Sequence, residues 1–168
     1  MDMTREIRIE EGKLKVVFEI QENGVVELKQ FDPAGRMDVK ERDRGEEDFY
    51  PITEIQITGR GTRGMHAYKH NVSGGATDFV YQSHEVLENE KGKELVIHTA
   101  TEYGVKGEYH MQFYANVAAV QVWTTLKNEG TEEIGLEYVS SFIYQGLCQS
   151  GEKPYFEKTS IYTPHNSW

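Results

Sequence analysis

The sequence has one cysteine, Cys148, and few basic residues. A single cysteine excludes an internal disulfide and is typical of a reducing compartment, so we expect a cytoplasmic protein. No apolar run approaches the ~20 residues that a membrane-spanning helix needs, and the N-terminus shows no apolar signal-peptide core. The 18 Lys and Arg against 28 Asp and Glu leave a net charge of −10. This balance argues against binding nucleic acid or an anionic membrane surface, whereas a neutral sugar is indifferent to it.

Helical periodicity is also missing. Apolar residues alternate with polar ones along most of the 168 residues, in segments rich in Val, Ile, Tyr, Phe, Trp and Thr. This pattern predicts β-strands with one buried face. Asn23-Gly24 between two such segments predicts a hairpin, and "NEKGK" separates two more. We therefore predict one all-β domain over 1–168, an antiparallel β-sandwich, with a closed barrel as the alternative.

Two stretches interrupt the strand pattern. Residues 32–51 are charged, and residues 59–78 are polar and rich in glycine. Loops of this length in a compact domain are functional or mobile, so either stretch is a candidate for ligand contact.

The familiar catalytic and metal-binding patterns are weak. His66 and His70 have the spacing of zinc ligands on a helix, but glycines flank them and no third ligand follows, so we predict neither a metal nor a cofactor. "GRGTRG" lacks the Lys-Ser/Thr of a phosphate loop, and neither Ser140 nor Ser141 lies in a nucleophile elbow. Cys148 would need an oriented histidine to act as a nucleophile.

Ten Tyr, seven Phe and two Trp make the chain rich in aromatic rings. Tyr and Trp combine an apolar face with a polar edge, which suits a sugar ring. Aromatic residues also fill sandwich cores and cross-strand pairs, so both interpretations stay open.

The C-terminal half resembles a known family. "FVYQSHEVLENEKGKELVIHT", then "VWTTLKNEGTEEIGLEYVSSF", then "PHNSW" resemble, in this order, the N-terminal domain of family-36 glycoside hydrolases, the α-galactosidase group. The resemblance covers 79–168 well and the first sixty residues loosely. It implies a supersandwich of the galactose-mutarotase type packed against a catalytic (β/α)₈ barrel that this sequence does not contain.

The resemblance implies that this chain is a non-catalytic domain that supports the barrel and the rim of its α-galactoside pocket. The barrel would supply the catalytic aspartates, so no catalytic residue is assigned here. His165, Asn166 and Trp168 are the substrate-proximal candidates, because they offer donors, an amide and a stacking face near the seam between domains. Trp168 would pack on the neighbouring domain, and a homo-oligomer is compatible with the sequence.

Two other functions remain open. The chain could be a stand-alone carbohydrate-binding module that uses surface aromatic rings. It could instead be a small aldose-epimerase-like enzyme, since sugar mutarotases share the supersandwich. That activity needs a histidine and a glutamate that converge, and His98, His110 and Glu108 are the strand candidates.

Overall fold

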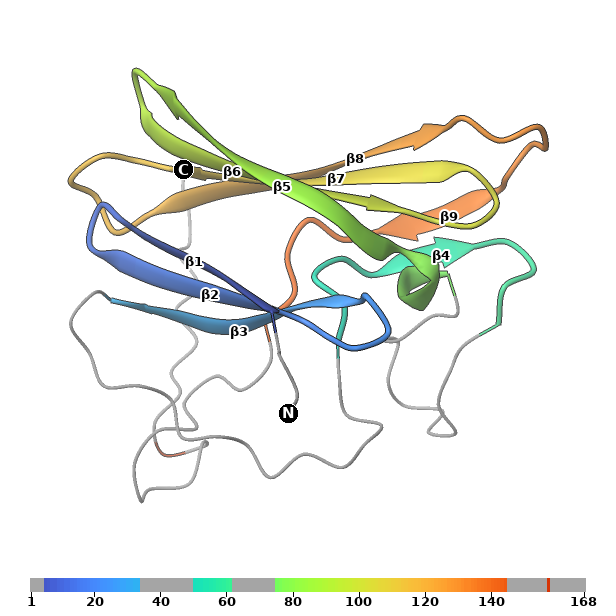
Figure 1. The fold of residues 1–168 in the computed structure, drawn as a ribbon, viewed down its shortest axis with the longest axis horizontal. Coiled ribbons are helices and arrows are strands. Elements are labelled where there is room, and N and C mark those ends of the chain that lie inside the picture. The colour runs from blue at the N-terminus through green and yellow to red at the C-terminus, as the bar shows by residue number, and fades with distance from the viewer. Residues whose placement is uncertain (1–4, 34–49, 62–74, 145–156, 158–168) are drawn as a thin grey trace, which may run out of the picture.

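The computed structural model describes residues 5–33, 50–61 and 75–144, together with Glu157. Within these ranges the chain is almost entirely β-structure, in three antiparallel sheets (Figure 1). The strands are β1 (Arg5–Glu11), β2 (Leu14–Ile20), β3 (Val26–Pro33), β4 (Ile55–Ile57), β5 (Val80–Asn89), β6 (Gly92–Ala100), β7 (Val105–Phe113), β8 (Val120–Asn128) and β9 (Leu136–Val139), with one 3-10 turn at Ala76–Asp78.

The first sheet is the meander β1–β2–β3. The predicted hairpin at Asn23-Gly24 is confirmed, because β2 and β3 pair on either side of it. Only Gly24 has a positive φ there (82°), and the Gln21 amide donates to the Val25 carbonyl at 2.9 Å. The turn is therefore a three-residue loop that ends in a left-handed glycine, rather than a turn with two positive-φ residues.

The β1–β2 hairpin was not predicted from the sequence. Its turn places Gly12 and Lys13 at φ values of 65° and 98°, the pair of positive values that a tight type I′ turn requires. A side chain at Gly12 would also meet the carbonyl oxygens of Tyr114 and Val117, so the turn packs tightly on the β7–β8 connection. β1 alternates charged and apolar residues, and Ile7 and Ile9 are its buried positions.

The second sheet is the meander β5–β6–β7–β8. The hairpin expected around "NEKGK" is present, but its strands extend to Asn89 and Gly92 and leave only Glu90 and Lys91 in the turn. Residues of β6 and β7 alternate between the two faces of this sheet. The inner face carries Leu95, Ile97, Tyr109, Met111 and Phe113, all of them buried.

The core lies between these two sheets. Phe18 from the first sheet packs edge-on against Tyr109 from the second, with ring centroids 5.9 Å apart. A short third sheet pairs β4 with β9, two strands that are about eighty residues apart in the chain, at one end of the sandwich (Figure 1). Ile55 and Ile57 of β4 join Phe79 and Val105 in a second apolar cluster there.

The structure is an antiparallel β-sandwich, which confirms the predicted fold class. Two open sheets with free edge strands face each other, so the closed-barrel alternative is wrong for the part of the chain described. No described helix is long and apolar enough to cross a membrane.

Candidate functional site

The outer face of the β5–β8 sheet carries a network of imidazoles, carboxylates and an indole. Antiparallel register sets its layout, because His98 of β6 lies opposite Glu108 of β7, and His110 of β7 lies opposite Trp123 of β8. Side chains opposite one another on a face are close enough to interact. The even-numbered residues of β6 and β7 therefore meet here.

Glu108 lies between the two histidines. Its Oε1 is 3.6 Å from His98 Nδ1, and its Oε2 is 3.5 Å from His110 Nε2. These three residues are the ones predicted from the sequence as a convergent histidine–glutamate group, and the structure brings them together. The Glu108 side chain is 45% exposed, so a molecule on this face can reach the carboxylate.

Two further carboxylates complete the network. His98 Nε2 lies 3.3 Å from Glu85 Oε1 on β5, and His110 Nδ1 lies 2.9 Å from Glu94 Oε1 on β6. Each imidazole is thus placed between two carboxylates. Both nitrogens of each ring therefore face a carboxylate oxygen at 2.9–3.6 Å.

The network surrounds an apolar residue. Val96 lies opposite Glu85 on one side and opposite His110 on the other, and it is only 3% exposed although it belongs to the outer face. The indole of Trp123 stacks on His110. The His110–Glu94 pair, with side chains 14% and 18% exposed, is the most buried part of the network, and a hydrogen bond is stronger there than in open water.

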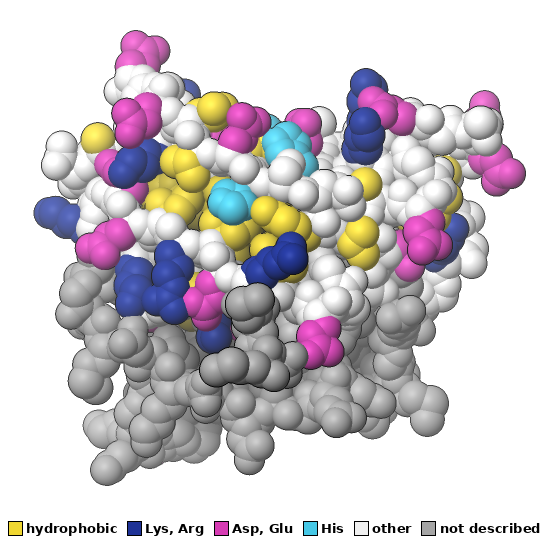
Figure 2. All heavy atoms as spheres, viewed as in Figure 1, with side chains coloured by type: hydrophobic (Ala, Val, Ile, Leu, Met, Phe, Trp, Pro, Cys, Tyr) yellow, Lys and Arg dark blue, Asp and Glu magenta, His cyan; other side chains and the backbone are white. Residues whose placement is uncertain are grey.

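Figure 2 shows histidine and acidic side chains close together over β5 and β6. Glu85, Glu94 and Trp123 also belong to this group, and the sequence pattern alone does not predict their membership. Their alternation places them on one face of their strands, but only the strand register shows which residues of other strands they meet. His84, another candidate from the sequence, lies on the opposite face of the sheet. Its Nδ1 forms a hydrogen bond with the Tyr81 hydroxyl at 2.8 Å.

A polar cleft of about 390 Å³ lies at the end of the sandwich where β4 meets β9. Arg60 and Tyr103 line this cleft, and so do Glu132 and Glu133. The guanidinium carbon of Arg60 lies 3.9 Å from the centroid of the Tyr103 ring, and Arg60 forms an ion pair with Asp78 at 2.8 Å. Burial, together with the nearby Asp78 carboxylate, raises the pKa of the Tyr103 hydroxyl. Both Arg60 partners belong to the protein itself, so its charge is already compensated.

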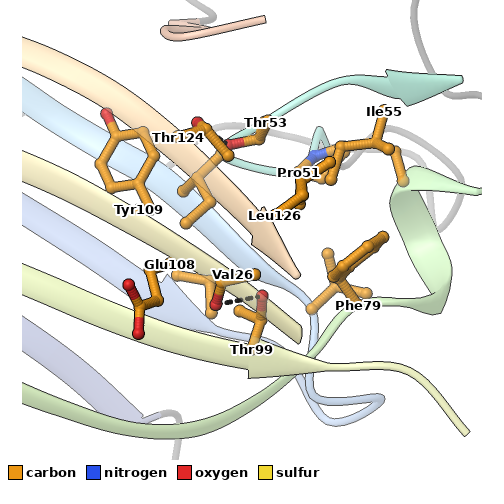
Figure 3. A pocket seen from close by; sticks show the side chains of 14 residues that line it. Val26, Pro51, Thr53, Ile55, Phe79, Thr99, Glu108, Tyr109, Thr124 and Leu126 are labelled. Atoms are coloured by element: carbon orange, nitrogen blue, oxygen red, sulfur yellow. Dashed lines mark hydrogen bonds between the residues drawn. The ribbon is translucent and has the colours of Figure 1, made fainter. Parts of the chain in front are cut away.

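A second cavity lies between the sheets, beside Tyr109 (Figure 3). Pro51, Ile55, Phe79 and Leu126 line it, and the Glu108 carboxylate points away from it. Its volume of about 20 Å³ has room for roughly one water molecule, whereas ligand pockets usually measure 300 Å³ or more. This cavity is a packing feature and not a sugar site.

Several candidates from the sequence lie outside the described residues. These are His165, Asn166 and Trp168, together with His66, His70 and Cys148. Within the described ranges, no group of three or more His, Cys, Asp or Glu side chains is arranged to hold a metal ion.

The fold and the network define an all-β sandwich with a polar, aromatic outer face. No known family profile matches the sequence, and no curated protein matches it. Among solved structures the chain is similar to a crystal structure of a variant of the GH36 α-galactosidase AgaA from Geobacillus stearothermophilus in complex with 1-deoxygalactonojirimycin. The similarity has a TM-score of 0.55 at 14% identity, and it covers 79% of this chain but only 23% of that chain. The fold is thus related to part of a GH36 α-galactosidase.

Proposed function

We propose that this chain is a non-catalytic sandwich domain of an α-galactosidase-like glycoside hydrolase, and that it supports a catalytic barrel and the rim of its carbohydrate pocket. The observation that carries the proposal is the asymmetric coverage of the structural match. Most of this chain matches less than a quarter of the GH36 enzyme, so most of that enzyme has no counterpart here.

The carboxylates of the outer face also favour a supporting role. Glycoside hydrolysis requires two carboxyl groups on either side of one sugar, with a raised pKa on the acid. Glu85, Glu94 and Glu108 lie instead along a sheet face, and each contacts an imidazole. They are thus engaged with histidines of the same face and do not form a pair on either side of a sugar-sized pocket.

The experiment is a hydrolysis assay with an aryl α-galactoside and the purified 168-residue chain. We expect no turnover. Hydrolysis that survives purification and disappears in Glu108→Gln or Glu94→Gln would contradict the proposal, because the chain would then contain its own catalytic groups.

The C-terminal candidates belong to the same proposal. We propose that His165, Asn166 and Trp168 lie at the seam between sandwich and barrel and contact the substrate or the barrel. In a Trp123→Phe variant Trp168 is the only tryptophan. Red-shifted, readily quenched fluorescence is expected, because its partner surface is on the other domain. A blue-shifted, quencher-resistant emission from a monomer would contradict this placement.

A second candidate function is aldose epimerisation, and the placement of Glu108 between His98 and His110 favours it. A carboxylate could take the proton of an anomeric hydroxyl while a protonated imidazole gives one to the ring oxygen. Polarimetry of freshly dissolved α-galactose tests it. Enzymatic mutarotation lost in Glu108→Gln but kept in Thr125→Ala, a neighbour on the same face, would support the epimerase. Sugar binding without any turnover would favour a carbohydrate-binding module.

A further inference from the structure

The edge strand β5 is unusually exposed. Among the strands that the structure describes, it pairs only with β6, and every residue from Gln82 to Asn89 is exposed. Val86 and Leu87 in its middle are 45% and 43% exposed. Natural sheets usually protect a long edge with lysine, proline or a covering segment. β5 has no lysine or proline over its ten residues, and its bulge between Tyr81 and Ser83 precedes the stretch from His84 to Glu88, in which Glu85 and Glu88 are the acidic residues.

The register of the sheet shows which backbone groups of β5 point outward. The Thr101 amide donates to the Val105 carbonyl at 2.9 Å, so odd-numbered residues of β6 direct their backbone bonds towards β7. Even-numbered residues of β6 therefore bond to β5, where their partners are Ser83, Glu85, Leu87 and Asn89. The backbone amides and carbonyls of the intervening residues, His84, Val86 and Glu88, consequently face the free edge.

These three residues are self-complementary about Val86. When a second β5 lies antiparallel with Val86 opposite Val86, His84 of each copy lies opposite Glu88 of the other. An imidazole opposite a carboxylate can hydrogen-bond to it across the two strands, whereas two carboxylates opposite each other repel. The Tyr81 hydroxyl hydrogen-bonds to His84 Nδ1 at 2.8 Å, so Glu88 of a second copy would meet His84 through Nε2.

The apolar pair also fits a two-fold contact. Val86 would meet its own copy on the axis, and Leu87 would lie opposite Glu85 of the partner, covering part of both exposed side chains. Figure 2 shows apolar side chains exposed along the side of the sandwich where β5 lies, which extends this surface beyond the strand.

We propose that the β5 edge is a homodimer interface, in which two copies join through antiparallel β5 strands around a two-fold axis at Val86. The result is one continuous sheet of eight strands across the dimer, four from each copy. The two-fold axis makes each contact occur twice, as in other isologous interfaces. The interface is independent of the glycosidase-related role proposed above.

The test is the mass of the full chain in solution, measured by sedimentation velocity and light scattering across a wide concentration range. The unaltered chain is expected to be a dimer. His84→Glu places two glutamates opposite each other in both symmetric pairs, and should raise the dissociation constant by roughly tenfold or more. Exchanging the two residues in a His84→Glu/Glu88→His variant restores both pairs and should restore the dimer.

A matched control is Val117→Lys, since Val117 is a 53% exposed apolar residue in the β7–β8 connection. It should leave the dimer intact, whereas Val86→Lys should break it. Circular dichroism of each variant checks that the monomer is folded. A monomeric unaltered chain would overturn the proposal. So would a dimer that His84→Glu and Val86→Lys leave unchanged, or a double exchange that fails to restore the dimer from folded protein.

Discussion

The indole of Trp123 lies flat against the imidazole of His110, with ring centroids 4.7 Å apart and planes 7° from parallel. This contact joins the edge strand β8 to β7 on the outer face and covers one side of an imidazole that is only 14% exposed. Trp123 therefore has a structural role on this face, beyond any role as an exposed ring for a sugar.

Removal of the indole should destabilise the sandwich. We expect Trp123→Leu to lower the free energy of unfolding by about 1–2 kcal/mol, because both the apolar area and the stacking on His110 are lost. Trp123→Phe should lose less, since it keeps a ring. Urea denaturation measures the difference, and Thr125→Ala, exposed on the same face, serves as the control within about 0.5 kcal/mol. An unchanged free energy of unfolding in Trp123→Leu would mean that the stacked contact does not contribute to stability.

The inner pair of the network should be stronger than an ordinary surface pair. His110 and Glu94 are 14% and 18% exposed, whereas Lys127 and Glu129 are 71% and 35% exposed. Less solvent screening predicts a larger coupling energy for the first pair, roughly 1 kcal/mol, than for the exposed second pair. Double-mutant cycles with His110→Phe and Glu94→Gln, and with Lys127→Ala and Glu129→Gln, measure both. Equal coupling in the two cycles would contradict this prediction.

Glu129 should make stability sensitive to acid. Hydrogen bonds and ion pairs from Lys106 and Lys127, each 2.6 Å away, lower the pKa of Glu129 from 4.5 to about 2. A lowered folded-state pKa contributes stability above about pH 4.5, and this contribution is lost as the pH falls towards 2. Glu129→Gln should therefore melt at a lower temperature than the unaltered chain at pH 7, and the gap should close near pH 2. A gap independent of pH would exclude this cause.

Replacement of Tyr109 should raise the stability of the protein, whereas replacement of Glu129 should lower it. Its hydroxyl is buried and has no hydrogen-bond partner among the described residues, and burial raises its pKa well above 10. We expect Tyr109→Phe to stabilise the protein by about 1 kcal/mol, because it removes an unsatisfied buried group. A raised folded-state pKa also means that the unaltered chain loses stability as the pH rises above about 10, so the advantage of Tyr109→Phe should grow there.

Thermal melts of the two proteins between neutral and alkaline pH measure both effects. Phe18→Leu, which removes the ring that packs on Tyr109, is the destabilising control in the same cluster. A Tyr109→Phe variant that is less stable at pH 7 would show that the hydroxyl has a favourable partner.

Much of the fold was predictable because its signals are local. Alternating apolar residues place β6 and β7 with one face towards the core, and Asn23-Gly24 marks a hairpin through the conformational freedom of glycine. β1 was missed although Ile7 and Ile9 alternate with charged residues. β4 was missed because three residues are too few to show a period.

The sequence alone determined that the chain is all-β, and it indicated His98, His110 and Glu108 as strand residues that could act together. Only the tertiary structure decided that they do, because a shift of one residue in register moves every side chain to the other face of the sheet. The same holds for Glu85, Glu94 and Trp123, which come from three strands and meet only through pairing. It also decided that β5 is an edge with His84, Val86 and Glu88 directed outward, since strand order is a long-range property that no local pattern records.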